Sequence, residues 1–160
     1  MAQLPCPEAT FDLATSFDVI YSLDDETERQ ALAEMHRVLK PGGVAFINAA
    51  ALDILTGSHA TLANERRRYT TARLRAKLDA AGFDVIRMSY TNFTTLPLTL
   101  AVRLAQRWAG HGGEAAETEM AVPAAPVNGL LAGCLRIEAA LLRVTSLPAG
   151  SSVMCVARRR

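Results

Sequence analysis

The sequence predicts an α/β fold, in which a largely parallel sheet carries helices on its faces. Over residues 1–92, apolar segments of strand length alternate with segments of helical periodicity in the order β-α-β-α-β. Most connections between them are short, which favours parallel strands joined by right-handed crossovers. Half of the residues are hydrophobic and 21% are charged, a balance typical of one globular domain with a packed core.

Composition and charge exclude several classes of function. The formal net charge of +1 gives no reason to expect binding to nucleic acid or to an acidic membrane surface. Cys6, Cys134 and Cys155 share no metal-ligand spacing and make no disulfide framework, so we expect free thiols and no metal site. The amino terminus does not resemble a signal peptide, and the most apolar stretch, residues 96–105, is interrupted by Arg103 and too short for a bilayer. We therefore expect a cytoplasmic protein without stable membrane insertion.

The first two elements are a strand and a helix. The segment FDLATSF, residues 11–17, has an apolar core between turn residues and is predicted to be a short, buried strand. Asp24 and Asp25 supply an N-cap and negative charge for the first turn of a helix that runs to about Leu39. An apolar stripe on this helix, which includes Leu32, must pack against the rest of the domain.

A tight turn then leads into the second strand. Pro41 lacks a backbone N–H and disfavours the α region at Lys40, so the helix must end here. Gly42 and Gly43 can adopt positive φ and let the chain reverse direction. Residues 44–49 are too apolar for a sheet with one wet face, which is typical of a strand covered on both sides.

A long connection over residues 51–69 precedes the next helix and strand. Thr70 or Thr71 can cap a helix in which leucines and alanines recur at helical spacing, and Gly82 is placed to end it. Residues 83–88 then form the third strand.

The remainder of the chain carries two apolar helices and one more strand. The helices are expected over residues 94–109 and 127–145, with a Gly-, Pro- and Glu-rich linker near 110–125 that should be mobile. Residues 151–157 form the last strand, and Arg158 begins a basic tail that should be frayed and solvated. One face of the second helix carries Leu130, Cys134, Ile137, Leu141 and Val144.

These elements divide a single domain, residues 1–160, into three parts. The βαβαβ part occupies residues 1–92, the two apolar helices with their linker lie within 93–146, and the last strand with its basic tail forms 147–160. We find no internal repeat.

Three segments resemble, in their order and spacing, the later half of a class I S-adenosylmethionine-dependent methyltransferase. They are LPCPEATFDLATSFDVIYSL (4–23), EMHRVLKPGGVAFIN (34–48) and RRRYTTARLRAKLDAAGFDV (66–85). In that family they correspond to the fourth strand and its loop, the following helix with the fifth strand, and the helix and strand after them. The tail PVNGLLAGCLRIEAALLRVTSLPAGSSVMCVAR (126–158) is similar to the end of one bacterial subgroup, where a Leu-Pro-x-Gly turn leads into a final antiparallel strand.

The resemblance implies a partial Rossmann-like methyltransferase sheet. Its strand order would be third, last, second, first, with the last strand antiparallel between its two neighbours. The sequence has no Gly-x-Gly-x-x-Gly loop. The resemblance therefore implies a truncated domain, in which the glycine-rich loop and the acidic residues that hold S-adenosylmethionine would precede Met1. The cofactor should then bind this chain weakly or not at all.

The resemblance also suggests where the cofactor would lie. Ligands of open parallel sheets bind at the carboxyl ends of the strands. Thr15, Ser16 and Phe17 are at that end of the first strand, near the methionine part of the cofactor in the family, and Tyr21 is in the following loop. The alternative is that Phe17 and Tyr21 are ordinary core aromatics. Ser22 occupies a position where the family often has histidine, which removes one candidate acid or base.

A second candidate cluster follows the second strand. In the subgroup that the chain resembles, a similarly placed histidine and an Arg-Arg-Tyr run border the acceptor pocket, which implies substrate binding by His59, Arg68 and Tyr69. Arginine offers a planar fork for carboxylate or phosphate, and histidine titrates near neutral pH. The alternative is a solvated basic loop in which Tyr69 packs against the next helix.

The implied activity is methyl transfer to a small-molecule acceptor. A sulfonium donor is already activated, so the protein mainly aligns the reacting atoms and excludes water, and no catalytic side chain is assigned. The alternative is a non-catalytic domain that acts through association with another chain. The expected first strand would leave one sheet edge bare, which favours self-association through that edge.

Overall fold

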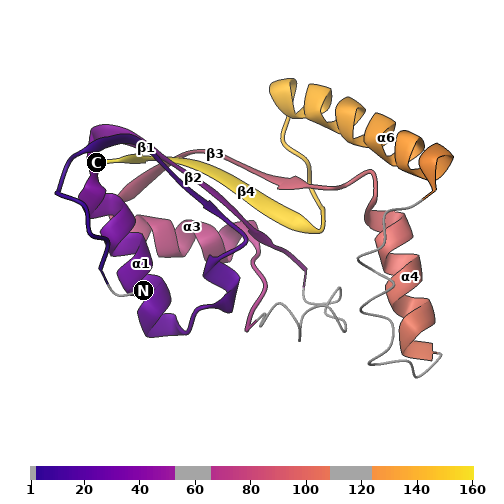
Figure 1. Cartoon of the computed structure of the whole chain (residues 1–160), viewed down its shortest axis with the longest axis horizontal. Helices are drawn as coiled ribbons and strands as arrows, with labels where there is room; N and C mark the ends of the chain where they lie inside the picture. The colour runs from indigo at the N-terminus through magenta and orange to yellow at the C-terminus, as the bar shows by residue number, and fades with distance from the viewer. Residues whose placement is uncertain (1–2, 53–65, 109–123) are drawn as a thin grey trace.

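The computed structural model describes residues 3–52, 66–108 and 124–160, and shows a sheet with helices on one of its faces (Figure 1). The elements in chain order are β1 (Phe11–Phe17), η1 (Ile20–Ser22), α1 (Asp25–Val38), β2 (Leu39–Ala50), α3 (Thr71–Ala80), β3 (Phe83–Thr91), α4 (Leu96–Trp108), α6 (Ala125–Val144) and β4 (Ser152–Arg159).

The four strands form one sheet in the order β1-β2-β4-β3. β1 and β2 are parallel, whereas β4 runs antiparallel to both of its neighbours, β2 and β3. The predicted α/β fold is confirmed, including the last strand inserted between the second and third strands. The likeness of the tail to a final antiparallel strand therefore identified its place in the sheet correctly.

The core lies between the sheet and the layer formed by α1 and α3 (Figure 1). Alternate residues of β2 and of β4 point into this layer and have no exposed surface, among them Ala45, Ile47 and Cys155. Leu32 of α1 and Leu74 of α3 belong to the same buried cluster. The predicted apolar stripe of the first helix thus packs as expected.

The opposite face of the sheet is much more open, and the prediction of a buried first strand is wrong. Phe11, Leu13 and Phe17 of β1 are 41%, 57% and 59% exposed. Within the described residues, β1 is an edge strand that pairs only with β2. The apolar pattern of FDLATSF is that of a strand covered on both faces, but only the face of Ala14 and Ser16 meets the helices.

The Lys-Pro-Gly-Gly segment ends α1 as predicted, but it is accommodated inside a strand. β2 begins at Leu39, directly after the helix, because Leu39 pairs with Phe11. The next pair is Leu13 with Val44, so the residues between Leu39 and Val44 bulge out of the ladder. Gly42 has a φ of +77° in this bulge, a conformation that glycine adopts readily.

The basic tail is ordered, in contrast to the frayed end that we expected. Arg159 lies in β4 and donates hydrogen bonds to the carbonyl oxygens of Arg37, at 3.2 Å, and Leu39. Arg160 donates to Asp84 Oδ1 at 2.7 Å. The guanidinium of Arg159 therefore ties the end of β4 to the carbonyl groups where α1 passes into β2.

Helices α4 and α6 lie beyond the end of the sheet (Figure 1). The buried carboxylate of Glu138 attaches α6 to the segment between β3 and α4. It accepts hydrogen bonds from the backbone N–H groups of Asn92 and Thr94 and from the Thr94 hydroxyl. Arg87 of β3 also donates to carbonyl oxygens of the last turn of α6 and its cap. The linker that we predicted to be mobile lies largely outside the described residues.

The Leu-Pro-x-Gly turn before β4 has a steric reason. Any Cβ at Gly150 would collide with the carbonyl oxygen of Thr91, at the end of β3. Gly150 is therefore required for the close approach of the two backbones. Gly82, which ends α3 as predicted, has a φ of +89°.

Replacing Gly150 by alanine should destabilise the domain by at least about 2 kcal/mol, because β3 and β4 must separate to admit the methyl group. Urea unfolding followed by circular dichroism would measure the loss. Gly129→Ala is the matched control, since open space surrounds this helical position, and it should leave stability unchanged or raise it by about 0.5–1 kcal/mol. Equal effects of the two substitutions would contradict the steric explanation.

Cys155 should be chemically silent in the folded protein. Burial raises the pKa of its thiol to about 12, so the reactive thiolate is absent at pH values near neutrality. Cys6 and Cys134 are only half-buried. Titration with a thiol reagent at about pH 8 should therefore label Cys6 and Cys134 in the native state and Cys155 only after denaturation. Rapid labelling of Cys155 without denaturant would show that the core opens more easily than its burial implies.

Candidate functional site

The carboxyl ends of β1 and β2 lie side by side and are joined by polar contacts. Asp18, the first residue after β1, adopts a φ of 54°, and its N–H donates to the carbonyl oxygen of Asn48 at 3.0 Å. The Asn48 side-chain amide donates in turn to Asp18 Oδ1 at 3.2 Å. This edge is where open parallel sheets bind ligands.

The structure separates the three predicted cofactor residues of β1 onto two faces. Thr15 and Phe17 are exposed on the open face, where the Phe17 ring lies 5.2 Å from the ring of Phe46. Ser16 points the other way, toward the helix layer, and is only 9% exposed. Since side chains alternate along a strand, a ligand on the open face would meet Thr15 and Phe17 but not the side chain of Ser16.

Tyr21 connects the two clusters that the sequence suggested. It lies in the short η1 helix, half-buried, and its carbonyl oxygen accepts hydrogen bonds from the N–H groups of Arg66, at 3.0 Å, and Arg67, at 3.3 Å. The loop after β1 is therefore held against the segment 66–69 that returns after β2. His59, the remaining predicted substrate residue, lies outside the described residues.

Arg68 and Tyr69 have different surroundings. Arg68 is half-buried, and its Nη1 donates to the carbonyl oxygen of Ala51 at 3.1 Å. Tyr69 has no exposed surface, and its hydroxyl donates to Glu28 Oε1 at 2.6 Å. Burial and the bond to Glu28 both raise the pKa of Tyr69, so its hydroxyl stays protonated. In this arrangement Tyr69 packs against the helix layer, which is the alternative considered for it, and makes no surface for an acceptor.

Glu28 is the residue at the centre of these contacts that the sequence analysis missed. Its side chain is fully buried, and its Oε2 accepts from Arg67 Nη1 at 2.9 Å and from Lys77 Nζ at 2.7 Å. A signal was present, because Glu28 stands one turn before Leu32 on the apolar stripe of α1. An acid on an apolar stripe indicates a buried charge that requires partners.

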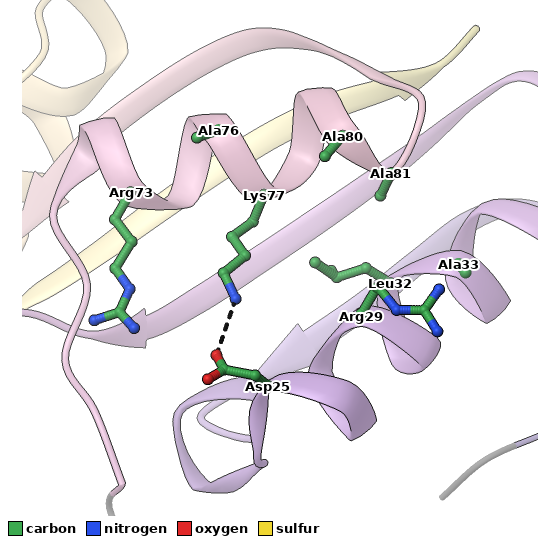
Figure 2. Close-up of a pocket in the computed structure, with 9 residues that line it drawn as sticks. All are labelled: Asp25, Arg29, Leu32, Ala33, Arg73, Ala76, Lys77, Ala80 and Ala81. Atoms are coloured by element: carbon green, nitrogen blue, oxygen red, sulfur yellow. Dashed lines mark hydrogen bonds and ion pairs between the residues drawn. The ribbon is translucent and has the colours of Figure 1, made fainter.

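A hollow of about 530 Å³ lies between α1 and α3, on the helix side of the domain (Figure 2). Alanines of both helices and Leu32 form much of its lining. Arg73 and Lys77 of α3 point across toward α1, where Lys77 Nζ lies 3.3 Å from Asp25 Oδ1. None of the predicted site residues lines this hollow, so it is distinct from the carboxyl edge of the sheet.

The described parts of the chain contain no group of three or more His, Cys, Asp or Glu side chains that could hold a metal ion.

Comparison with known proteins finds similarity to one family and to several solved structures of one fold. Residues 1–47 match the model of a methyltransferase domain. A protein of Mycolicibacterium smegmatis named "Probable S-adenosylmethionine-dependent methyltransferase" is 33% identical over 122 residues, which are 75% of this chain and 44% of that protein. The chain thus spans less than half the length of this curated relative.

Solved structures show the same fold at low identity. An S-adenosylmethionine-dependent methyltransferase of Mesorhizobium loti superposes with a TM-score of 0.54 at 14% identity, covering 99% of this chain and 66% of that one. The cyclase SpnF superposes with a TM-score of 0.53 at 19% identity, covering 99% of this chain and 53% of that one. Two chemistries on one fold show that the fold alone does not define the reaction.

The sheet order, the antiparallel β4 and these superpositions define a Rossmann-like α/β domain of the methyltransferase type. The family model, matched over residues 1–47, and the curated relative show that the chain is similar to class I S-adenosylmethionine-dependent methyltransferases. S-adenosylmethionine is the cofactor that this resemblance implies.

Glu28→Gln should destabilise the domain by about 3 kcal/mol, because it removes the charge that pairs with Arg67 and Lys77 in a buried position. Thermal or urea unfolding would measure the change. Glu26→Gln is the matched control on the same helix, since the pair of Glu26 with Arg29 is exposed and worth less than about 1 kcal/mol. A loss as small as that of the control would show that the buried network does not hold the domain together.

Proposed function

We propose that this chain takes part in methyl transfer from S-adenosylmethionine to a small-molecule acceptor, and that the carboxyl edge of β1 and β2 is the ligand-binding edge. The observation that supports the place of the site best is the contact of Tyr21 with Arg66 and Arg67, which joins two segments that sequence reasoning had assigned to cofactor and acceptor. Free cysteines are compatible with a reducing compartment, and we place the protein in the cytoplasm.

Thr15 and Phe17 are the residues that we propose to border the methionine part of the cofactor, with Tyr21 in the adjoining loop. Both β1 side chains are accessible, and Phe17 and Phe46 together present aromatic surface next to the strand end. Arg68 is the described candidate for the acceptor side, and His59 is proposed with it. The buried Ser16 and Tyr69 would act through the backbone and the loop that they support.

The described residues fit only part of the cofactor. Among them, glycines with positive φ occur only at Gly42 and Gly82, each in a segment that leads into a strand rather than out of one. A glycine-rich cradle at a carboxyl end, which lets the backbone approach a phosphate-like or ribose group, is not present in the parts of the chain that are described. We therefore derive no reaction step for this chain by itself.

A non-catalytic role through association with another chain is the second candidate. The exposed β1 edge, with Leu13 and Phe17 beside it, is the observation that favours it. One similar structure is the complex of the Haloferax volcanii Trm112 methyltransferase activator with a methyltransferase, matched at 17% identity with a TM-score of 0.53 over 98% of this chain and 57% of that one. Association with a second chain, including self-association through β1, is thus compatible with this fold.

The 160-residue chain alone should bind S-adenosylmethionine negligibly. Hydrogen bonds to charged groups contribute about 1.5–3 kcal/mol each. Among the described residues no glycine cradle lies at the carboxyl edge, and the loss of two such hydrogen bonds alone would lower affinity at least about a hundredfold, which places a micromolar site toward the millimolar range. Isothermal titration of the purified chain would measure this.

Phe17→Ala is the test variant for that titration, and Phe93→Ala is its matched control. If weak binding is detectable, the Phe17 variant should reduce it further, whereas Phe93→Ala, at an exposed phenylalanine after β3, should not. A clear micromolar isotherm with the unmodified chain would contradict the prediction and would mean that the described residues form a complete cofactor pocket.

A further inference from the structure

Helix α6 carries an apolar stripe that no described part of the chain covers. The face that includes Glu138 is held to the body, whereas large apolar side chains beside it are exposed. Their exposed fractions are 48% for Val127, 69% for Leu130, 62% for Ile137, 43% for Leu141 and 83% for Val144. The helix lies at the periphery of the domain, beyond the end of the sheet (Figure 1).

The spacing of this stripe is that of a helix–helix seam. Together with the half-buried Cys134, its members recur alternately three and four residues apart from Val127 to Val144, which is the a/d pattern of a coiled coil. The charged residues of α6 are off the seam. Arg136 and Arg143 lie on its outer side, and Glu138 is buried against the loop after β3.

The seam is self-complementary when two helices run antiparallel. A two-fold axis between Leu135 and Arg136 pairs Val127 with Val144 of the second copy, Leu130 with its Leu141, and Cys134 with its Ile137. The outer layers then join Val with Val and Leu with Leu, the central layers join the smaller Cys with Ile, and no charge is placed in the seam. An interface in which the same patch serves both partners is the usual one in dimers with two-fold symmetry.

Small residues flank the seam on its solvent side and permit close approach. Gly133 and Ala140 lie seven residues, or about two helical turns, apart and next to the seam. Open space surrounds the Cβ position of Gly133, so no contact within the described chain explains a glycine that weakens a helix interior. Helix axes can approach to about 8 Å where the contact residues are small.

The area agrees with a reversible dimer. α4, which also lies in the outer part of the domain, adds three further exposed side chains, Leu98, Val102 and Leu104. If each of these eight exposed side chains of α4 and α6 loses roughly 50 Å² to the partner, two copies bury about 800 Å² in total. Stable interfaces of standard size bury about 1,200 Å² or more. The dimer should therefore be weak and readily reversible.

From this seam, we propose that α6 is a homodimerisation helix, which pairs antiparallel with α6 of a second copy of this chain. The contact is separate from the open β1 edge and does not depend on the methyltransferase function.

Sedimentation equilibrium of the full chain, from low-micromolar to submillimolar concentration, tests the association. The unmodified chain should show a monomer–dimer equilibrium. Leu130→Glu combined with Ile137→Glu should weaken it at least about a hundredfold, because four carboxylates would enter the seam. Ala139→Glu, on the opposite side of the same helix, should leave it unchanged, and circular dichroism would show that each variant is folded.

Disulfide cross-linking tests the register in which the two α6 helices pair. It does not require the helix to accept a charged side chain. Ile137→Cys should form a disulfide with Cys134 of the second copy under mild oxidation, identified by peptide mapping, whereas Ala139→Cys should not. A chain that stays monomeric at all concentrations would overturn the proposal. So would a dimer that survives the double glutamate variant but is lost with Leu13→Lys and Phe17→Lys in β1. A monomer that sediments with phosphatidylglycerol vesicles would equally overturn it, because the apolar face would then be a lipid surface.

Discussion

The buried carboxylate of Glu28 is the constraint on which the proposed ligand-binding edge depends. It lies on α1, yet its three partners come from the segment after β2 and from α3. A buried charge is tolerable only when it is paired, so Tyr69, Arg67 and Lys77 must all stay in place around it. The position of residues 66–69 beside the loop after β1 follows from this requirement, because Arg67 also donates to the carbonyl oxygen of Leu23.

The two faces of the sheet have opposite physical characters. One is closed by α1 and α3 over Ala45, Ile47 and Cys155, and the other exposes the aromatic and aliphatic side chains of β1. The chains that this protein resembles are longer, since nearly the whole of this chain superposes on only 53% or 66% of them. Apolar surface of this kind is retained where another structural element or another molecule covers it.

Most of the fold could be predicted because its signals are local. The capping oxygens of Asp24 and Thr70 and the glycine at 82 define helix ends through contacts within one turn, and all three were recognised. Errors arose where the outcome depends on distant partners. The exposure of β1 depends on what covers it, and the order of the tail depends on carbonyl groups at Arg37 and Leu39 that are far away in sequence.

The position of the candidate site stays a prediction, and the orientation of its side chains could not be derived from the sequence. The resemblance indicated the carboxyl end of β1, and Thr15 and Phe17 are accessible there. Strand alternation alone assigns Ser16 to the opposite face, but which face is open could not be known from seven residues. Tyr69 is the clearer case, because its burial depends on Glu28, which precedes it by 41 residues.

The central position of β4 has a consequence for how the domain assembles. β4 hydrogen-bonds to β2 across a sequence separation of 112 residues, for example from Ala45 to Ala157, and it is the only link between β2 and β3 in the described sheet. During synthesis, β1 and β2 can pair early, but β3 has no strand to join until β4 emerges from the ribosome. The nascent chain therefore presents two open strand edges for most of its translation. Closing the sheet late across so long a loop is slow, and chaperones that shield strand edges should matter more for this domain than for one whose neighbouring strands follow each other in sequence.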